Sequence, residues 1–319
     1  MDNRYYRTLL ERMDEPGLQR RTDFSSGREA IYKDDVFICG DGDVPEDADL
    51  VEKLTVKPHL VLFGCGHVGK ALYDLAVIQD MRTTVLDCRE GLLTAERYPE
   101  AERICGEYED LLKREYDGFY SPYYCIFTHG HVHDADCLYY ALTHRHSYIG
   151  MIGSASKIEH CLQEMRNRGI SELMLREVHS PIGLAINAVT PQEIAVAIMA
   201  EIIAVFRADK KAVDVDPHVI ARAAVEQGIM IRIIGKTGSA PRSVGSMMFV
   251  TGNSFCGTVG GGAIERHAID RAKQMLSDGE QVLIEKHELS GKDKLGMICG
   301  GTNTLIYRFV GHDKAGTEN

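Results

Sequence analysis

A glycine-rich hexapeptide is the first candidate binding site in this sequence. Residues 64–69 read G-C-G-H-V-G and match the G-x-G-x-x-G pattern of dinucleotide-binding loops. Gly64 would permit a tight turn, Gly66 would let a pyrophosphate approach the backbone, and Gly69 would let helix and strand pack closely. His67 is a further candidate cofactor-binding residue, and the N-terminus of the helix expected after the loop would add unpaired N–H groups and a partial positive charge. The alternative is a turn that is glycine-rich only for packing.

An acidic residue stands where such a loop needs one. Asp87 lies 23 positions after Gly64, at the end of the next expected strand, where its carboxylate could accept hydrogen bonds from ribose hydroxyls. Arg89 follows two residues later, so the choice between NAD and NADP stays open. We therefore expect a nucleotide or phosphate site at this end of the sheet.

Three histidines alternate in a loop after another expected strand. The segment 128–134 reads T-H-G-H-V-H-D. Ligands bind at the carboxyl ends of strands in open α/β sheets, and histidine serves there as a metal ligand or as an acid and base. His129 and His131 are the candidate catalytic groups. A ligand-facing role, a metal site and ordinary loop hydrogen bonding all remain open.

A second strand–glycine–helix junction follows at residues 153–157, G-S-A-S-K. Gly153 and Ser154 could provide a further anion contact at the same edge of the sheet. Capping of the helix by the Ser154 hydroxyl explains the pattern equally well.

Another glycine run precedes an amphipathic segment in the last third of the chain. Backbone N–H groups of Gly260, Gly261 and Gly262 could cradle a phosphate, although no G-K-[ST] follows as in a Walker A loop. Arg242, in a separate loop, could make a bidentate phosphate contact. Glu265 stands in the first expected helical turn, where a catalytic role and a favourable interaction with the helix dipole are both open.

One cysteine stands beside two glycines near the C-terminal end. Cys299 precedes Gly300 and Gly301, which would allow a ligand to approach closely. A soft thiolate could coordinate molybdenum or another soft metal, so Cys299 is a candidate catalytic and metal-binding residue. The alternative is a small buried apolar side chain, as most free cysteines are.

Alternating strand and helix patterns position the first of these loops. Short apolar or β-branched runs predict buried parallel strands at 59–63, 83–86, 123–127 and 148–152. Helical spacing follows at 70–78, and residues 190–207 open with Thr and Pro, a good start for a helix. Strands that alternate with helices predict an α/β fold with a Rossmann-like parallel sheet.

The character of the chain changes after the charged segment 209–216. Helical and strand patterns then predict a smaller α+β glycine-rich domain, with helices at 219–227 and 263–276 and strands at 229–234 and near Val282 and Thr304. We therefore divide the chain into a Rossmann-like nucleotide- or cofactor-binding domain at 57–208 and a small domain at 209–319. Residues 1–56 read as a partly helical lead-in and an acidic linker, because residues 34–52 carry eight acidic residues and no Lys or Arg.

Composition limits the classes of function. The 319 residues carry a net charge of −11, which argues against a general nucleic-acid binder. The longest apolar stretch, residues 194–206, is too short to span a bilayer, and the N-terminus lacks the apolar core of a signal peptide. Nine cysteines without a C-x-x-C pair indicate free thiols in a reducing cytoplasm. The apolar content permits a homodimer.

Taken together, these segments resemble the xanthine dehydrogenase accessory factor family (XdhC/CoxI). The resemblance runs from about Leu60 to Phe309. In the first half it rests on V-L-F-G-C-G-H-V-G, V-L-D-C-R, T-H-G-H-V-H-D, Y-I-G-M-I-G-S and S-P-I-G-L-A-I-N-A-V-T-P-Q-E-I-A-V-A-I-M-A-E-I. In the second half it rests on G-S-A-P-R-S-V-G, G-T-V-G-G-G-A-I-E and G-M-I-C-G-G. The family usually places its glycine-rich module first, whereas here the order is reversed, and many relatives have Cys where this chain has Ala263.

The resemblance implies a role with molybdenum hydroxylases. Such a factor binds the molybdenum cofactor (molybdopterin), supports its sulfuration and passes it to an apo-hydroxylase of the xanthine dehydrogenase type. A cysteine desulfurase is the implied second partner. Anionic groups of the cofactor would suit the glycine-rich helix N-termini, and Cys299 would suit its metal.

Two other functions fit the residues. An NAD(P)-dependent oxidoreductase with His129 or His131 as proton donor explains the first glycine loop but leaves the small domain without a purpose. A nucleotide-sensing regulator without chemistry is the other alternative. The sequence leaves open whether any catalytic step occurs.

Overall fold

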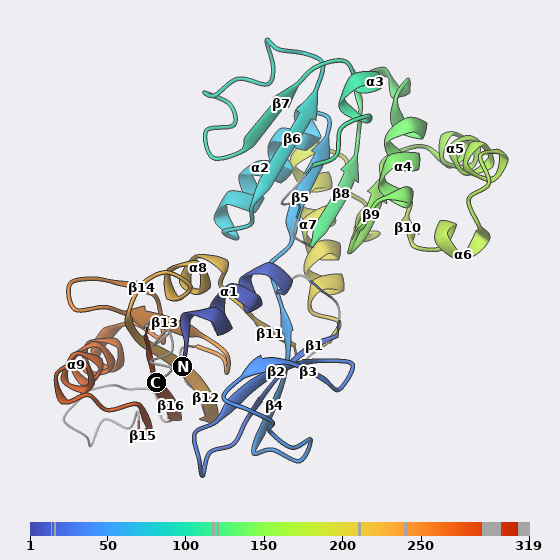
Figure 1. The fold of residues 1–319 in the computed structure, drawn as a ribbon. Coiled ribbons are helices and arrows are strands. Elements are labelled where there is room, and N and C mark those ends of the chain that lie inside the picture. Colours follow the sequence, from blue (N-terminus) through green and yellow to red (C-terminus); the bar gives the residue numbers. More distant parts are fainter. Residues whose placement is uncertain are drawn as a thin grey trace. The chain divides into compact units, whose positions relative to one another are not determined.

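Two separately packed units make up the chain (Figure 1). The structure is a computed structural model that describes residues 1–13, 15, 17–116, 119, 121–209, 212–238, 242–288 and 301–311. The first unit, Lys57–Lys210, is called the parallel-sheet unit below. The second combines Met1–Val56 with Lys211–Asn319 and is called the two-sheet unit.

Six parallel strands form the sheet of the parallel-sheet unit, in the order β10-β9-β8-β5-β6-β7. The strands are β5 (His59–Phe63), β6 (Thr83–Asp87), β7 (Glu102–Cys105), β8 (Pro122–Ile126), β9 (Tyr148–Met151) and β10 (Val178–His179). The connecting helices are α2 (His67–Ile78), α3 (Tyr108–Leu111), η1 (His129–His131), α4 (Asp134–Thr143), α5 (Ala155–Asn167), α6 (Glu172–Leu175) and α7 (Pro191–Phe206). This arrangement confirms the predicted α/β fold with a Rossmann-like parallel sheet.

Both faces of this sheet are covered by helices, which is why its four central strands, β5, β6, β8 and β9, are buried along their whole length. Leu60 and Leu62 of β5 lie in a core with side chains of α2 and α7. Val61 and Phe63 point to the opposite face and pack with side chains of α4 and α5. Helix α7 begins with a complete capping box formed by Thr190 and Glu193.

The two-sheet unit is built on two five-stranded sheets with the orders β11-β4-β1-β2-β3 and β14-β13-β12-β16-β15. Every pair in them is antiparallel except β11 with β4. The strands are β1 (Leu18–Thr22), β2 (Glu29–Lys33), β3 (Val36–Gly40), β4 (Leu50–Thr55), β11 (Ala212–Asp214), β12 (Gly228–Thr237), β13 (Met247–Val250), β14 (Phe255–Gly257), β15 (Val282–Glu288) and β16 (Thr302–Val310). Its helices are α1 (Asn3–Arg12), α8 (Pro217–Ala223) and α9 (Gly262–Asp278). None of the helices in the described ranges has the length and apolar character needed to cross a membrane.

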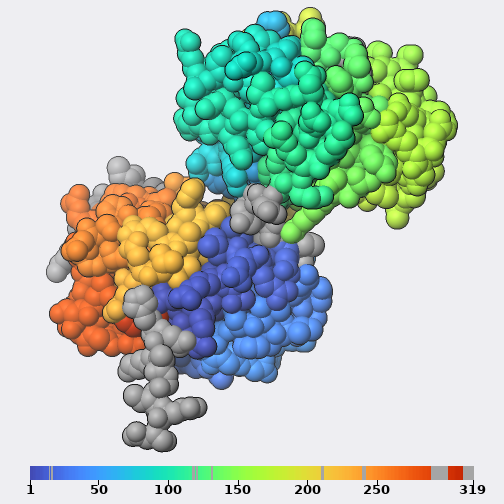
Figure 2. All heavy atoms as spheres, turned by 45° about the horizontal axis from the view of Figure 1, so that its top comes forward, coloured from blue at the N-terminus to red at the C-terminus, as the bar shows by residue number. Residues whose placement is uncertain are grey.

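Residues 1–56 differ from the lead-in and acidic linker expected from the sequence. They form α1 and four strands, and Figure 2 shows this N-terminal segment (blue) directly beside the yellow segment that contains α8. The side-chain amide of Asn3 donates to the carbonyl of Ala223 at 2.7 Å, and Tyr5 and Tyr6 share a core with Val219. The first segment is therefore part of one core with the last third of the chain.

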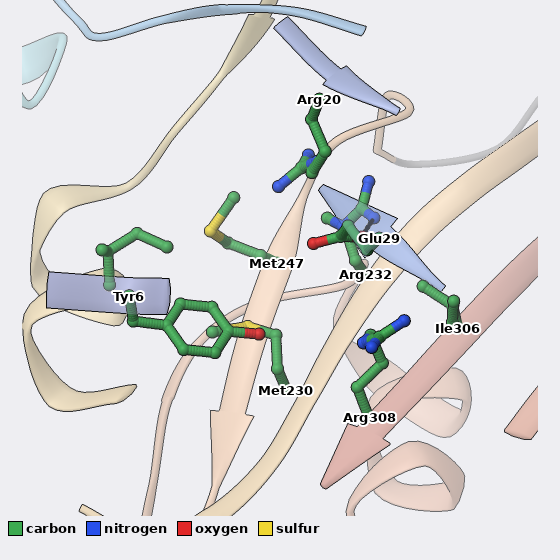
Figure 3. A pocket seen from close by; sticks show the side chains of 9 residues that line it. Tyr6, Arg20, Glu29, Met230, Arg232, Met247, Ile306 and Arg308 are labelled. Atoms are coloured by element: carbon green, nitrogen blue, oxygen red, sulfur yellow. Dashed lines mark hydrogen bonds and ion pairs between the residues drawn. The ribbon is translucent and has the colours of Figure 1, made fainter. Parts of the chain in front are cut away.

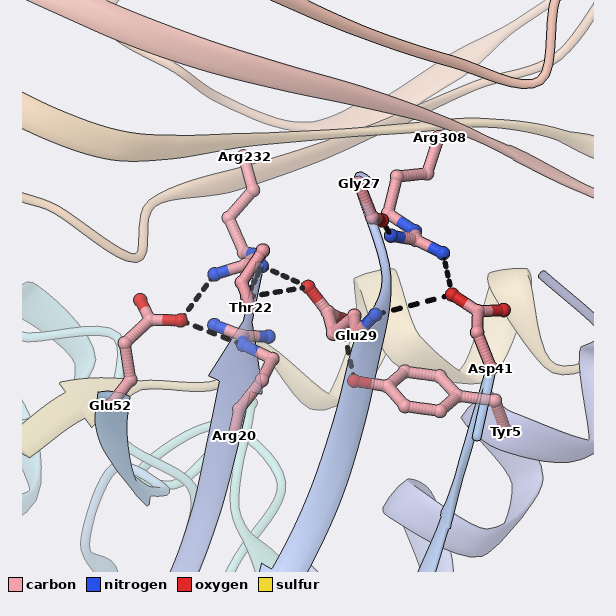
Figure 4. A network of polar contacts seen from close by, with 9 residues as sticks. All are labelled: Tyr5, Arg20, Thr22, Gly27, Glu29, Asp41, Glu52, Arg232 and Arg308. Carbon is pink, nitrogen blue, oxygen red and sulfur yellow. Dashed lines mark hydrogen bonds and ion pairs between the residues drawn. The ribbon is translucent and has the colours of Figure 1, made fainter. Parts of the chain in front are cut away.

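A buried network of charged groups joins β1, β2 and β4 to β12 within this unit (Figure 4). Arg232 of β12 makes ion pairs with Glu29 and Glu52, and Arg20 adds a contact to Glu52 at 2.8 Å. All four side chains are at most 3% exposed. Figure 4 also shows Arg308 of β16 paired with Asp41. Glu29 and Glu52 thus meet arginines from both sheets, a complementarity that no local pattern reveals. Of the eight acidic residues in 34–52, only Glu52 is buried, and the other seven are exposed as expected for a solvated segment.

Candidate functional site

The three glycines of the first loop differ in the space around them: two are required by close packing and one faces open space. Gly64 has a φ of +127°, and a Cβ there would lie 2.4 Å from the carbonyl oxygen of Phe127. A Cβ on Gly69 would lie 2.2 Å from the oxygen of Gly64, so helix α2 packs directly on the turn. Gly66, the N-cap of α2, has an ordinary φ of −68° and no atom within 4 Å of its Cβ position. The loop thus leaves an open approach to the N-terminus of α2, which starts at His67.

Asp87 ends β6 beside this loop, but its carboxylate is fully engaged within the chain. Oδ2 accepts a hydrogen bond from the backbone N–H of Cys65 at 2.7 Å, and Oδ1 accepts one from the backbone N–H of Arg89 at 2.9 Å. The Arg89 guanidinium contacts both oxygens, at 2.8 and 2.6 Å. Asp87 is 1% exposed, whereas the Arg89 side chain is 26% exposed. The group that this edge offers to a ligand is therefore a cation.

Cys65 lies within the loop as a buried, protonated thiol. The pKa of Cys65 is raised to about 12, mainly by burial and also by the neighbouring carboxylate of Asp87. The positive charge of Arg89 lowers the pKa by less. A thiol with this pKa is a poor nucleophile and a poor metal ligand at neutral pH.

The histidine loop is organised by a buried carboxylate rather than by its histidines. Asp134 is 0% exposed and accepts hydrogen bonds from the backbone N–H and the hydroxyl of Thr128, at 3.1 and 2.5 Å. Lys157 of α5 makes an ion pair with its other oxygen. This pair connects the loop after β8 to the helix after β9. The sequence offers Asp134, with the three histidines, as a possible metal ligand or acid–base group, but neither motif indicates its pairing with Lys157, which lies 23 positions away.

The two histidines of this loop whose side chains the structure describes, His129 and His133, lie in different surroundings. His129 is exposed, and His133 stacks on the ring of Tyr108 with 4.9 Å between centroids. The side chain of His131 lies outside what the structure describes. Among the described residues, no group of three potential metal ligands includes a residue of this loop. The catalytic roles of His129 and His131 stay predictions.

Ser154 has the capping role that was one of its two interpretations. Its hydroxyl accepts from the backbone N–H of Lys157 at 3.4 Å, and it is the N-cap of α5. Gly153 precedes it at the same edge of the sheet, directly after β9.

In the two-sheet unit, Glu265 occupies the position that an anion would take at the second glycine run. Its Oε2 accepts from the backbone N–H of Gly261 at 3.1 Å and from the hydroxyl of Thr258 at 2.5 Å. Gly261 and Gly262 have φ values of +71° and +63°, and nothing lies within 4 Å of their Cβ positions. Gly260 donates to Thr258 at 3.2 Å. An incoming phosphate would therefore compete with a carboxylate of the protein itself.

Two other predicted residues stand apart from this arrangement. Arg242 is exposed in the connection between β12 and β13. Cys299, with Gly300, lies outside the described residues, so its predicted contact to a metal stays a prediction.

A cavity in the two-sheet unit is too small for a cofactor. It lies among Tyr6, Arg20, Glu29, Arg232 and Arg308, as Figure 3 shows. Its volume is about 10 Å³, which is about the space that one water molecule needs. The candidate sites are therefore the surface at the first glycine loop in the parallel-sheet unit and the surface at the second glycine run in the two-sheet unit, and not this cavity.

Both units match family models. The XdhC Rossmann domain model matches residues 60–202, and the XdhC and CoxI family model matches residues 221–286. The chain belongs to the XdhC and CoxI family. The first match contains the Gly64–Gly69 loop and the second contains the Gly260–Gly262 run, so each candidate loop lies in a matched range of this XdhC family member. Residues 1–56 lie outside both matches.

Curated relatives are similar over about half of this XdhC family chain. A probable xanthine dehydrogenase subunit from Bacillus subtilis (strain 168) is 29% identical over 153 residues, which are 48% of this chain and 44% of that protein. The uncharacterized protein YqeB of Escherichia coli (strain K12) is 28% identical over 155 residues, 47% of this chain and 28% of that protein. The matched part spans less than half the length of either relative.

A solved structure shows the same fold. The crystal structure of a xanthine dehydrogenase from Bacillus halodurans superposes with a TM-score of 0.50 and 24% identity, over 65% of this chain and 64% of that one.

Proposed function

We propose that this chain is an accessory factor for a molybdenum hydroxylase of the xanthine dehydrogenase type. In this role it binds the molybdenum cofactor, supports its sulfuration with sulfur from a cysteine desulfurase, and passes it to the apo-hydroxylase. The proposal is carried by the matches of both units to XdhC family models. The relative from Bacillus subtilis, whose name refers to xanthine dehydrogenase, supports the choice of client.

The geometry of the first glycine loop suits the anionic end of such a cofactor. The open space at Gly66 and the N–H groups at the start of α2 would receive the phosphate, and the partly exposed Arg89 would add a positive charge. Asp87 is held by Arg89 and has no free oxygen for a ribose, which favours this interpretation over ordinary dinucleotide binding. When bound, the cofactor would bring the molybdenum centre that the client enzyme needs.

Direct binding tests the proposal. Purified full-length protein would be titrated anaerobically with molybdenum cofactor, and in the same buffer with NAD(H) and NADP(H). Gly66→Ala is the informative variant because the backbone at residue 66 accepts a Cβ that would obstruct the helix N-terminus. Gly252→Ala is the matched control, since Gly252 is exposed, remote in sequence and also has no atom within 4 Å of its Cβ position.

Two outcomes would contradict different parts of the proposal. Binding of NAD(P)H without cofactor binding would overturn the accessory role and favour a redox enzyme. Cofactor binding that Gly66→Ala leaves unchanged would keep the role but move the site away from this loop. We expect tight cofactor binding, a loss of at least about tenfold in Gly66→Ala, and transfer to an apo-hydroxylase measured as recovered hydroxylase activity.

A further inference from the structure

Two histidines and a glutamate converge where helix α9 packs beside strand β15. His267 lies on α9, and Glu285 and His287 lie two residues apart on β15. Their ligand atoms all lie within 4.8 Å of one another. The Nε2 atoms of His267 and His287 lie 3.7 and 3.5 Å from the same oxygen, Oε2 of Glu285. None of these residues belongs to the proposed cofactor site.

Two of the three ligand atoms are buried without a hydrogen bond. His287 is 8% exposed, and among the described residues neither its Nε2 nor Glu285 Oε2 has a hydrogen-bond partner. Buried polar atoms are nearly always satisfied, so an unsatisfied pair that faces one point calls for a water or an ion.

The neighbouring strand adds further unsatisfied groups on the same face. Asn303 and Tyr307 of β16 stand opposite His287 and Leu283 in the register, and opposite residues of an antiparallel pair project to one face. Both polar atoms of the Asn303 side chain and the hydroxyl of Tyr307 are also buried without partners. This face of β15 and β16 therefore holds five such atoms, counting only residues that the structure describes.

We propose that His267, Glu285 and His287 form a binding site for a divalent transition-metal ion. Imidazole nitrogen with one carboxylate oxygen is a donor set for zinc and other first-row divalent metals. Tetrahedral ligands about 2.0–2.1 Å from a metal lie about 3.4 Å apart, close to the two observed separations of 3.5 and 3.7 Å.

The surroundings of the cluster suit an exchangeable metal. His267 is 44% exposed in its side chain and gives the ion a route from solvent. Three protein ligands leave a fourth position for water, the arrangement of open rather than structural zinc sites.

Arg271 orients the glutamate without blocking its metal-facing oxygen. Its Nε lies 3.3 Å from Oε1 of Glu285, the other carboxylate oxygen, and a second ion pair to Glu280 at 2.9 Å shares its charge. Carboxylate ligands of metals are commonly held in this way by a second group.

Cobalt titration of the full-length protein tests the site. The protein would carry no histidine tag, would be stripped with a chelator and kept reduced, and Co²⁺ would be followed by its visible d–d absorption. His267→Ala is the main variant because its exposed side chain can be removed without opening the core, and Glu285→Gln is the second. His218→Ala is the matched control, an exposed histidine on α8 of the same unit.

The expected result is one Co²⁺ per chain without thiolate charge-transfer bands, and its displacement by Zn²⁺. His267→Ala and Glu285→Gln should each weaken binding at least tenfold, while His218→Ala should bind as wild type does. Absence of saturable binding, thiolate bands from the cysteines, or unchanged affinity in both ligand variants would each overturn the proposal. None of these readouts depends on the molybdenum cofactor.

Discussion

The guanidinium of Arg89 donates two hydrogen bonds to the carboxylate of Asp87, with Nε 2.8 Å from Oδ1 and a terminal nitrogen 2.6 Å from Oδ2. In a dinucleotide-binding loop the equivalent acidic residue would face a ribose. Here Asp87 is buried and paired with Arg89 at the end of β6, so the partly exposed side chain at this edge of the sheet is the arginine. Because Asp87 is paired with Arg89, this edge of the sheet suits an anionic group better than a ribose.

Replacing the carboxylate of Asp87 should lower the free energy of unfolding and make it less dependent on pH in the acid range. Burial raises the pKa of Asp87, but hydrogen bonds from Arg89 and from two backbone N–H groups outweigh burial and hold the pKa at about 2. Unfolded aspartate titrates near pH ~3.9, so this contribution is present above that pH and is lost as the pH falls toward 2. Asp87→Asn should lower the free energy of unfolding by about 1–2 kcal/mol at pH 7 and flatten its dependence between pH 4 and 2. Urea unfolding at several pH values measures both, with Asp110→Asn as an exposed control; equal slopes for the two variants would contradict the prediction.

The glycines of the first loop should differ sharply in tolerance. Gly64→Ala forces a side chain into a positive φ and against the Phe127 carbonyl, which should cost about 2–5 kcal/mol. Gly66→Ala meets no atom and should cost about 1 kcal/mol at most, the effect of a poorer N-cap. Thermal unfolding of the two variants beside wild type makes the comparison. Equal losses would mean that the turn has another geometry.

Removing the central arginine of the buried network should destabilise the two-sheet unit. Arg232→Met leaves the buried Glu29 and Glu52 with one cation fewer, beside a cavity of only about 10 Å³. Loss of one partner from a buried ion pair costs about 3–5 kcal/mol. Arg266→Met, an exposed arginine on α9, should change the free energy of unfolding by less than about 0.5 kcal/mol. Urea unfolding followed by circular dichroism checks the difference, and a small effect of Arg232→Met would show that the network relaxes around the loss.

Alkylation of the native protein should discriminate among the described cysteines. Cys105 is exposed, whereas Cys65, Cys125 and Cys137 are buried. Burial raises the pKa of Cys65 to about 12, so access and ionisation both oppose its reaction. Iodoacetamide at pH 8 with peptide mass spectrometry should find Cys105 modified well before the other three. Modification of Cys65 at the rate of Cys105 would contradict the burial of the Cys65 side chain described above.

The second glycine run should bind anions better once its own carboxylate is removed. Glu265 accepts from the N–H of Gly261, so Glu265→Ala should lower the Kd for inorganic pyrophosphate at least about threefold, an effect of roughly 0.7 kcal/mol. Asp270→Ala removes one negative charge from an exposed position of the same helix and controls for net charge. Calorimetric titration gives both affinities. The same gain in both variants would assign the effect to net charge and not to the glycine run.

Local patterns in the sequence predicted the four central strands of the parallel-sheet unit, β5, β6, β8 and β9, but not the edge strands β7 and β10. The apolar run 59–63 became β5, buried on both faces, and the Thr190–Pro191 start became a complete cap for α7. The fingerprint loop lies between a strand and a helix as expected. These features could be predicted because each depends on residues only a few positions apart, whose spacing reflects strand and helix geometry directly.

Only the tertiary structure decided which partners the charged and ligand-forming residues have. Glu29 and Glu52 read as parts of a solvated lead-in and linker, yet their partner Arg232 lies 203 and 180 positions away and joins them in one core. His267 and His287 likewise belong to different elements and meet only because α9 packs beside β15. The amino-acid sequence determined the central elements of the parallel-sheet unit and the family, because these depend on short-range patterns and motifs. Burial, pairing of charges and convergence of ligands depend on contacts between distant segments, which form only when the chain has folded.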